Sequence, residues 1–312
     1  MEQKRLILRI GSILLGIAII LGLIIYSGTS EVLRLFHGVS WQWVFYALLL
    51  YCLTWVIRPL FIKLYTNFSF AYCFRIINIS YMMNAILPAK AGDFHLIYSI
   101  KKNGINLARS INILIHYRIM DLLSLIIISL PLLLIYLRDN IPEGIINYLI
   151  IIGIIVAIPI LILLDRKGII KNIFEMVEQK ISIKFFKDII GKSKEIYSDY
   201  DELLKTKKLL SFVIALSVWI LEGLVSYLMS LSIGHPIPIY IIFLAVSVGN
   251  ISKVIPVTPG GLGIYEATVI MLMGLFGVPP AVATLLSLID HVLKTLLGVL
   301  FGAISLIFVS KV

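Results

Sequence analysis

Twelve charged or titratable side chains lie inside, or at the edges of, long apolar stretches of this 312-residue chain. A charge within a bilayer is costly and normally faces a cavity or a partner of opposite charge. These positions are therefore the first candidates for binding a polar or charged substrate. They are Arg75, Lys90, Asp93, His116, Arg118, Asp121, Glu222, Lys253, Glu266, Asp290, His291 and Lys294.

Two pairs among them have helical spacing. Arg118 and Asp121 are three residues apart, and Asp290 and Lys294 are four apart, so each pair can interact on one helix face. The spacing of Arg118 and Asp121 fits a structural ion pair as well as a substrate-binding role. Glu222 stands alone in WILEGLV, where it is either an intramembrane ion-pair partner or a proton site.

The segment KVIPVTPGGLGIYEATV, residues 253–269, interrupts an apolar run with two prolines and three glycines. Proline ends a helix, and glycine lets a headgroup approach the backbone closely. A helix that restarts after such a break presents backbone N–H groups and a partial positive charge, which favour phosphate. A purely structural kink is the alternative, but it would need neither Lys253 nor Glu266.

The sequence contains no motif for metal or cofactor chemistry. It lacks HExxH, paired CxxC and nucleotide-binding loops, and Cys52 and Cys73 lie in apolar stretches. We therefore expect no metal, no cofactor and no enzymatic activity. The net charge of +10 is concentrated between the apolar runs, which indicates membrane topology rather than nucleic-acid binding.

The apolar composition predicts an all-α polytopic membrane protein. Hydrophobic residues make up 60% of the chain, the mean hydropathy is +1.03, and apolar runs reach the roughly 20 residues that cross a bilayer. The first run is too long for a signal peptide and has no cleavage site, so we interpret it as a retained helix. The predicted full spans are 6–28, 41–64, 110–137, 144–164, 209–233 and 281–309.

Two further apolar regions, 69–103 and 239–277, are interrupted at LPAKAGD and IPVTPGGLG. Their pieces are short for a crossing, which favours two re-entrant hairpins. Two tilted full spans joined by a short loop are the alternative.

Lysine and arginine place both termini in the cytoplasm of a cell-membrane protein. Arg58 and Lys63 are interpreted as marking the cytoplasmic end of the second span, and residues 165–208 are strongly basic. Segment 168–205 has the mixed apolar and charged pattern of amphipathic helices on the cytoplasmic surface.

With this topology the two interrupted regions enter from opposite sides, as in the inverted repeats of transporters. A shift of 173 positions supports a repeat, because it aligns Asp93 with Glu266 and Arg118 with His291. The predicted halves are residues 1–164, with the element 69–103, and residues 209–312, with the element 239–277. Residues 165–208 form the linker between them.

IPVTPGGLGIYEA resembles the signature P-x-T-P-G-G-L-G-x-x-E of the flippase-like family named for the transmembrane region of lysylphosphatidylglycerol synthase. The matching residues are Pro256, Thr258, Pro259, Gly260, Gly261, Leu262, Gly263 and Glu266. An earlier element, N-x-x-L-P-x-R-x-G-E, is matched by Asn84, Leu87, Pro88, Lys90, Gly92 and Asp93, with Lys in place of Arg and Asp in place of Glu. A third, E-R-x-x-D, is matched by Tyr117, Arg118 and Asp121, without its first acid.

The resemblance covers nearly the whole chain as a single membrane domain, 1–312, and implies a stand-alone member without a synthase domain. It implies translocation, by a flippase or scramblase, of an anionic phospholipid or a polyprenyl-phosphate-type lipid. In this interpretation Lys90, Arg118, Lys253 and Lys294 hold the phosphate, while Asp93 and Glu266 organise those cations or take protons. The alternative is a non-catalytic membrane subunit or scaffold for a lipid- or glycan-modifying enzyme.

The partners expected are membrane lipids with anionic headgroups, with a second copy of the chain or a membrane enzyme as candidate protein partners and no nucleic acid. The candidate substrate-binding residues are Lys90, Gly92, Asp93, Arg118, Asp121, Lys253, Thr258, Gly260, Gly261, Gly263, Glu266, His291 and Lys294.

Overall fold

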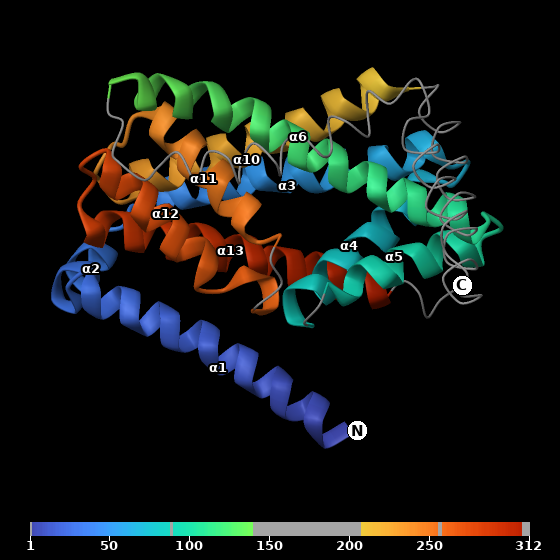
Figure 1. Ribbon diagram of the computed structural model, residues 1–312, viewed down its shortest axis with the longest axis horizontal. Helices are drawn as coiled ribbons and strands as arrows, with labels where there is room; N and C mark the ends of the chain where they lie inside the picture. The colour runs from blue at the N-terminus through green and yellow to red at the C-terminus, as the bar shows by residue number, and fades with distance from the viewer. Residues whose placement is uncertain (1, 88–89, 140–206, 255–257, 308–312) are drawn as a thin grey trace, which may run out of the picture.

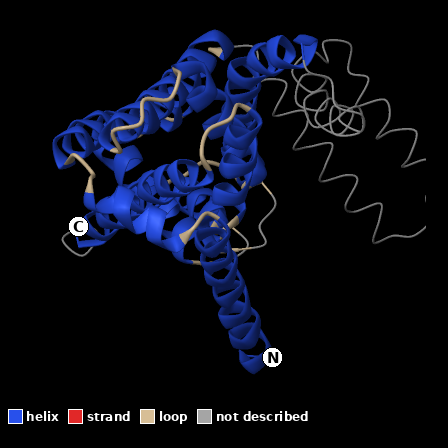
Figure 2. Cartoon of the chain, turned by 90° about the vertical axis from the view of Figure 1, so that its left-hand side faces the viewer, coloured by secondary structure: helices blue, strands red, loops and turns tan. Residues whose placement is uncertain are grey.

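The computed structural model describes residues 2–87, 90–139, 207–254 and 258–307. Within these ranges all regular structure is helical, as Figure 2 shows, so the all-α prediction is confirmed for this part of the chain. The predicted span 144–164 and nearly all of the 165–208 linker lie outside the described residues.

The chain starts with two helices that meet at a sharp bend. Helix α1 (Glu2–Tyr26) turns by 90° into α2 (Thr29–His37), and Gly28 at the bend has a φ of 85°. In Figure 1 the N-terminal part of α1 extends away from the main body, whereas Gly16 and Ile19 lie against Leu262 and Gly263. Many apolar side chains along α1 are exposed. Helix α2 buries Val32 but exposes Leu33 and Phe36.

Four long helices form the main body: α3 (Trp41–Tyr65), α6 (Leu107–Asp139), α10 (Lys208–Ser232) and α13 (Pro280–Ile307). They are long and apolar enough to cross a membrane, and the bent pair α1–α2 adds a fifth candidate among the described residues. Helix α3 packs along α10, and α13 packs along α4 (Figure 1). The chain is therefore a polytopic membrane protein with four or five described spans, where the sequence predicted six in the whole chain.

Two pairs of shorter helices lie between the long ones. They are α4 (Phe70–Ile86) with α5 (Ala91–Lys102), and α11 (Ile239–Ser252) with α12 (Ile264–Leu275). A 3-10 turn, η1 (Pro259–Gly261), separates the second pair. The 14 residues of α11 extend about 21 Å at 1.5 Å per residue, which is less than the roughly 30 Å hydrocarbon core. Helical structure is therefore interrupted at both predicted places, between α4 and α5 and between α11 and α12.

The first break is closed by contacts between α4 and the start of α5. The Gly92 N–H donates to Asn84 Oδ1 at 2.8 Å, and Ser80 Oγ donates to the Gly92 carbonyl oxygen. Lys90, which precedes α5, has a left-handed backbone with a φ of 52°. The hairpin brings Lys90 and Asp93 beside the last turns of α4.

Candidate functional site

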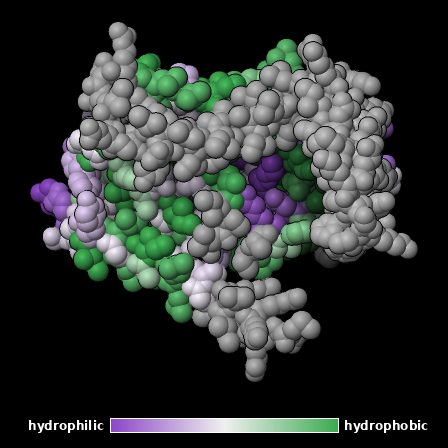
Figure 3. Space-filling model, viewed as in Figure 1, coloured by the Kyte–Doolittle hydropathy of each residue, from purple (hydrophilic) through white to green (hydrophobic). Residues whose placement is uncertain are grey.

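A pocket of about 380 Å³, lined by apolar and by charged side chains, lies between the two helix breaks and the four long helices. Figure 3 shows hydrophilic residues inside a hollow that has apolar residues beside it. Five cationic and four acidic side chains line it. The cations are Arg58, Lys90, Arg118, Lys253 and Lys294, and the acids are Asp93, Asp121, Glu222 and Asp290.

The pocket reaches the middle of the spans. Glu222 lies two residues from the centre of α10 (Lys208–Ser232), and Lys294 lies at the centre of α13 (Pro280–Ile307). Both side chains are buried. The charges therefore lie at a depth where water must enter through the pocket and where an unpaired ion is costly.

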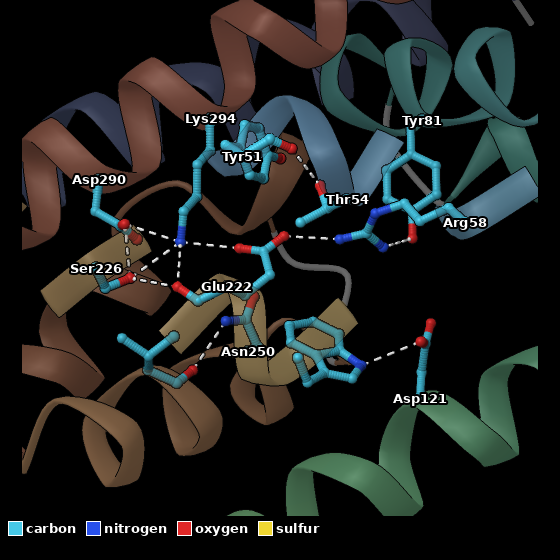
Figure 4. Close-up of polar contacts among 12 residues, drawn as sticks. Tyr51, Thr54, Arg58, Tyr81, Asp121, Glu222, Ser226, Asn250, Asp290 and Lys294 are labelled. Carbon is cyan, nitrogen blue, oxygen red and sulfur yellow. Dashed lines mark hydrogen bonds and ion pairs between the residues drawn. The ribbon is translucent and has the colours of Figure 1, made fainter. Parts of the chain in front are cut away.

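Glu222 is the centre of an ion-pair network in this pocket (Figure 4). Its Oε1 lies 2.7 Å from Arg58 Nη2 on α3, and its Oε2 lies 2.8 Å from Lys294 Nζ on α13. Lys294 Nζ is also 2.8 Å from Asp290 Oδ1, and it donates to Ser226 Oγ at 3.0 Å. Of the two roles considered for Glu222, the structure shows the ion-pair partner, and it has two.

Tyrosine hydroxyls extend this network at both ends. The Tyr265 hydroxyl donates to Asp290 Oδ2 at 2.9 Å. At the other end Arg58 donates to the Tyr81 hydroxyl, which lies 2.8 Å from the Tyr117 hydroxyl. Polar contacts therefore run continuously from α12 to α6 through the centre of the protein.

At the first break, Arg118 pairs with Asp93 rather than mainly with its helical neighbour. The guanidinium donates to both carboxylate oxygens of Asp93, while Asp121 Oδ2 is 3.8 Å away. Asn84 Nδ2 also donates to Asp93 Oδ1, at 2.9 Å. Asp121 accepts a hydrogen bond from Trp219 Nε1 at 3.1 Å. Both ion-pair contacts of Arg118 are therefore present, and the one with Asp93 is the closer.

At the second break, Glu266 caps helix α12 instead of facing the pocket. Its Oε2 accepts the Gly263 N–H at 2.7 Å, and its Oε1 lies 2.6 Å from His291 Nδ1. Glu266 is 1% exposed and is not among the pocket-lining residues, whereas His291 is. Glu266 was predicted to organise the pocket cations or to take protons, and its hydrogen-bond partners in the structure are Gly263 N–H and His291.

We expect Glu266→Ala to lower the stability of the protein by about 1–3 kcal/mol, because it removes the acceptor of both Gly263 N–H and His291. Glu266→Gln keeps a carbonyl oxygen for Gly263 and should cost less. Thermal unfolding of the detergent-purified variants measures this difference. Equal melting temperatures for parent and alanine variant would contradict the capping role.

The glycine turn uses its backbone amides internally. Gly261 N–H donates to the Thr258 carbonyl at 3.1 Å, and Leu262 N–H donates to the Pro259 carbonyl at 3.2 Å. Gly263 N–H is taken by Glu266, as described above. The expectation that the turn offers free amides to a phosphate is therefore wrong for these three positions, because the turn and the capping carboxylate satisfy them first.

The glycines instead permit close packing. A Cβ on Gly261 would lie 2.6 Å from Cγ of Lys253, and a Cβ on Gly263 would lie 2.7 Å from Cβ of Ile19 on α1. Gly260 (φ 63°) packs against the backbone of Ala85, which brings the two breaks into contact. The missing side chains let Lys253 cross the turn, where its Nζ lies 3.9 Å from the Tyr265 ring centroid.

Ten of the thirteen predicted residues line the pocket: Lys90, Asp93, Arg118, Asp121, Lys253, Thr258, Gly260, Gly261, His291 and Lys294. Gly92, Gly263 and Glu266 are not among the lining residues. Lys90 and Lys253 differ from the other lining cations, because no described carboxylate lies within 4 Å of either. Of the four predicted phosphate ligands, Arg118 and Lys294 are already paired with acids.

Sequence reasoning missed Arg58 as a site residue. It was interpreted as a cytoplasmic marker, but it is 3% exposed and binds Glu222. Its position in WVIRPL, with an apolar turn after it before the end of α3, was the available signal. Asn84 was noted as part of the matched N-x-x-L-P-x-R-x-G-E element, whereas the lining residues Trp219, Asn250 and Tyr265 carry no charge and gave no signal in the sequence.

Comparison with known proteins places the whole fold in one family. A family model described as the lysylphosphatidylglycerol synthase TM region matches residues 13–302. A UPF0104 membrane protein of Methanocaldococcus jannaschii, MJ1078, is 28% identical over 236 residues, which cover 73% of this chain and 94% of the relative. A UPF0104 membrane protein of Pyrococcus horikoshii, PH1989, is 25% identical over 324 residues, with 94% of each chain covered.

A shorter match involves the glycosyltransferase AglD of Haloferax volcanii, which is 34% identical over 98 residues, or 30% of this chain and 16% of that protein. No solved structure matches the chain. The family model covers far more than half of the sequence, including both helix breaks and every residue that lines the pocket. The chain therefore belongs to the family of lysylphosphatidylglycerol synthase TM regions.

Proposed function

We propose that this protein translocates lipids with an anionic headgroup, either a phospholipid or a polyprenyl-phosphate-type lipid, across the membrane. The observation that carries the proposal is the mid-span pocket, whose wall combines apolar surface with nine charged side chains and which is formed between two broken helices. A headgroup can cross the apolar core only where protein charges and water replace its hydration. A catalytic role is not part of this proposal.

An inverted repeat is the architecture that we propose for this function. Asp93 is the third residue of α5 and pairs with Arg118, 25 residues later on α6. Glu266 is the third residue of α12 and pairs with His291, 25 residues later on α13. The two acid–base pairs thus occupy equivalent positions after the two breaks.

Reciprocal helix packing supports the same interpretation. Helix α4 packs on α13 while α11, its proposed counterpart, packs on α6, and the counterparts α3 and α10 pack on each other. Helices of each half thus pack on helices of the other half, as is expected of two similar halves related by a pseudo-twofold axis in the membrane plane. In this arrangement α4–α5 and α11–α12 are re-entrant hairpins that enter from opposite sides.

The basic end of the bundle supports cytoplasmic termini. Lys207 at the start of α10 donates to the Leu64 carbonyl near the end of α3, at 3.0 Å, so Lys63 and Lys208 lie at the same end. Loops rich in Lys and Arg remain on the cytoplasmic side. The C-terminal end of α1 and the N-terminal end of α3 both adjoin α2. The N-terminus of α1 is therefore proposed to lie on the same side as the C-terminal end of α3, which is the cytoplasmic side.

A proteoliposome assay tests the proposed function. We expect the purified protein to move fluorescent phosphatidylglycerol between leaflets faster than empty liposomes do, as measured by dithionite quenching. Lys253→Ala should slow the movement of phosphatidylglycerol between leaflets more than that of phosphatidylcholine. The reason is that it removes from the pocket wall a cation with no described carboxylate within 4 Å. Lys101→Ala, which changes an exposed lysine outside the pocket, is the matched control.

Equal rates with and without protein would overturn the transport proposal. The alternative, a non-catalytic subunit or scaffold, is favoured by the match to part of a glycosyltransferase. It predicts a stoichiometric enzyme partner after purification from native membranes, together with no intrinsic lipid movement.

A further inference from the structure

The charges of the pocket wall are unevenly compensated. Three cations, Arg58, Arg118 and Lys294, each lie within salt-bridge distance of a carboxylate. Together with the four lining acids they form a group with one excess negative charge. Lys90 and Lys253 are the two remaining lining cations, and among the described residues neither has a carboxylate within 4 Å.

One of these two lysines lies at each helix break, although not at equivalent positions of the proposed repeat. Lys90 immediately precedes α5, and Lys253 immediately follows α11. The Lys253 ammonium is held over the Tyr265 ring, which stabilises a cation without neutralising it. Counted over the charged lining residues that the structure describes, the wall therefore carries a single net positive charge.

Resting on the proposed lipid-handling function, we infer that the pocket selects headgroups with a single phosphate, whose counter-ions are Lys90 and Lys253. One phosphodiester brings the wall to neutrality. A diphosphate would add charge that the wall does not compensate, at a depth where the effective dielectric constant is low. Arg58, Arg118 and Lys294 keep their carboxylate partners and serve to hold the helices around the site.

The expected order of affinities is opposite to that for an ordinary basic surface patch. A surface patch binds a ligand more tightly as its negative charge grows. The pocket should do the reverse, since every acceptor beyond the first phosphate meets a wall that already contains four carboxylates. The order of affinities is therefore diagnostic.

Binding to the full-length protein in a nonionic detergent, measured by calorimetry, tests the inference without requiring transport. The probes are farnesyl phosphate, farnesyl diphosphate and inorganic phosphate, used at a pH of about 5. This is below the second pKa of a phosphate monoester, about 6, so farnesyl phosphate then carries about one negative charge, as a phosphodiester does. We expect farnesyl phosphate to bind about tenfold more tightly than the diphosphate. Inorganic phosphate should bind far more weakly, because it lacks the apolar tail. Tighter binding of the diphosphate, no binding of farnesyl phosphate, or equal binding of inorganic phosphate would each overturn the inference.

Variants assign the charges to residues. Lys90→Gln and Lys253→Gln should each weaken the binding of farnesyl phosphate by about tenfold, whereas Lys101→Gln should leave its affinity unchanged. Asp121→Asn keeps an oxygen for the Trp219 N–H but removes one negative charge, so it should improve binding of the diphosphate. Unchanged affinities in both lysine variants would overturn the assignment.

Two outcomes separate this inference from the proposed function. Protein that moves lipids in liposomes but binds mono- and diphosphate alike retains the function and loses the single-phosphate selectivity. Protein that shows the expected order of binding but moves no lipid retains the selective site and loses the transport role. The melting temperature of each variant confirms that any loss of affinity is measured on folded protein.

Discussion

Gly92→Ala is expected to disrupt the first helix break and to abolish lipid movement. A Cβ at this position would overlap the carbonyl oxygen of Ser80 and come within 2.8 Å of Asn84 Oδ1. These are backbone and hydrogen-bonded atoms that cannot rotate away, so α5 would have to move off α4. Overpacking of this kind costs about 1–3 kcal/mol or more.

The displacement would also affect the site, because Asp93 follows Gly92 directly and pairs with Arg118. Gly274→Ala on α12 is the matched control, since a Cβ there meets nothing within 4 Å. That variant should be neutral or slightly stabilising, by up to about 1 kcal/mol. Thermal unfolding and the liposome assay on both variants provide the measurement. A fully stable and active Gly92→Ala protein would mean that the close α4–α5 contact is not needed.

Glu222→Ala is expected to be the most destabilising single change in the pocket. It removes the carboxylate that both Arg58 and Lys294 contact, at 2.7 and 2.8 Å. Lys294 retains Asp290, whereas among the described residues Arg58 keeps the Tyr81 hydroxyl and aromatic faces around its guanidinium. Removing one partner of a buried ion pair costs about 3–5 kcal/mol, because the other charge is left uncompensated.

The double variant Arg58→Gln, Glu222→Gln serves as the control. It removes both charges of the pair together and should recover much of the stability that Glu222→Ala loses. The melting temperatures of the single and double variants give the comparison. If the double variant is less stable than Glu222→Ala, the cost comes from lost packing and not from an unpaired Arg58.

Several features could be predicted from residues alone because their causes are local. The spans around 41–64, 110–137, 209–233 and 281–309 follow from apolar runs of bilayer length, and the structure confirms them. The breaks follow from proline and glycine in LPAKAGD and IPVTPGGLG, which interrupt the helical hydrogen-bond pattern. Charges within such runs are also expected to face a cavity or a partner of opposite charge, because their desolvation in the membrane is costly.

The pairing of those charges could not be predicted in this way, since partners that are far apart in sequence meet only after folding. Arg58 and Glu222 are separated by 164 residues, and Lys294 lies 68 residues from Ser226. Helical spacing suggested that Arg118 pairs with Asp121, but the α4–α5 hairpin brings Asp93 closer. Glu266 caps α12 from the third helical position after Gly263, which is a local spacing that the sequence analysis did not use. Its contact with His291, 25 residues later, depends on the tertiary fold.

The sequence by itself determined that the chain is a helical membrane protein with two broken helices and charges at the breaks. Hydrophobic length and backbone chemistry act over a few residues, and each can be recognised without a partner. The tertiary structure decided which of those charges remain available. It paired Arg58, Arg118 and Lys294 with carboxylates from other helices, and left Lys90 and Lys253 as pocket cations with no described carboxylate within 4 Å.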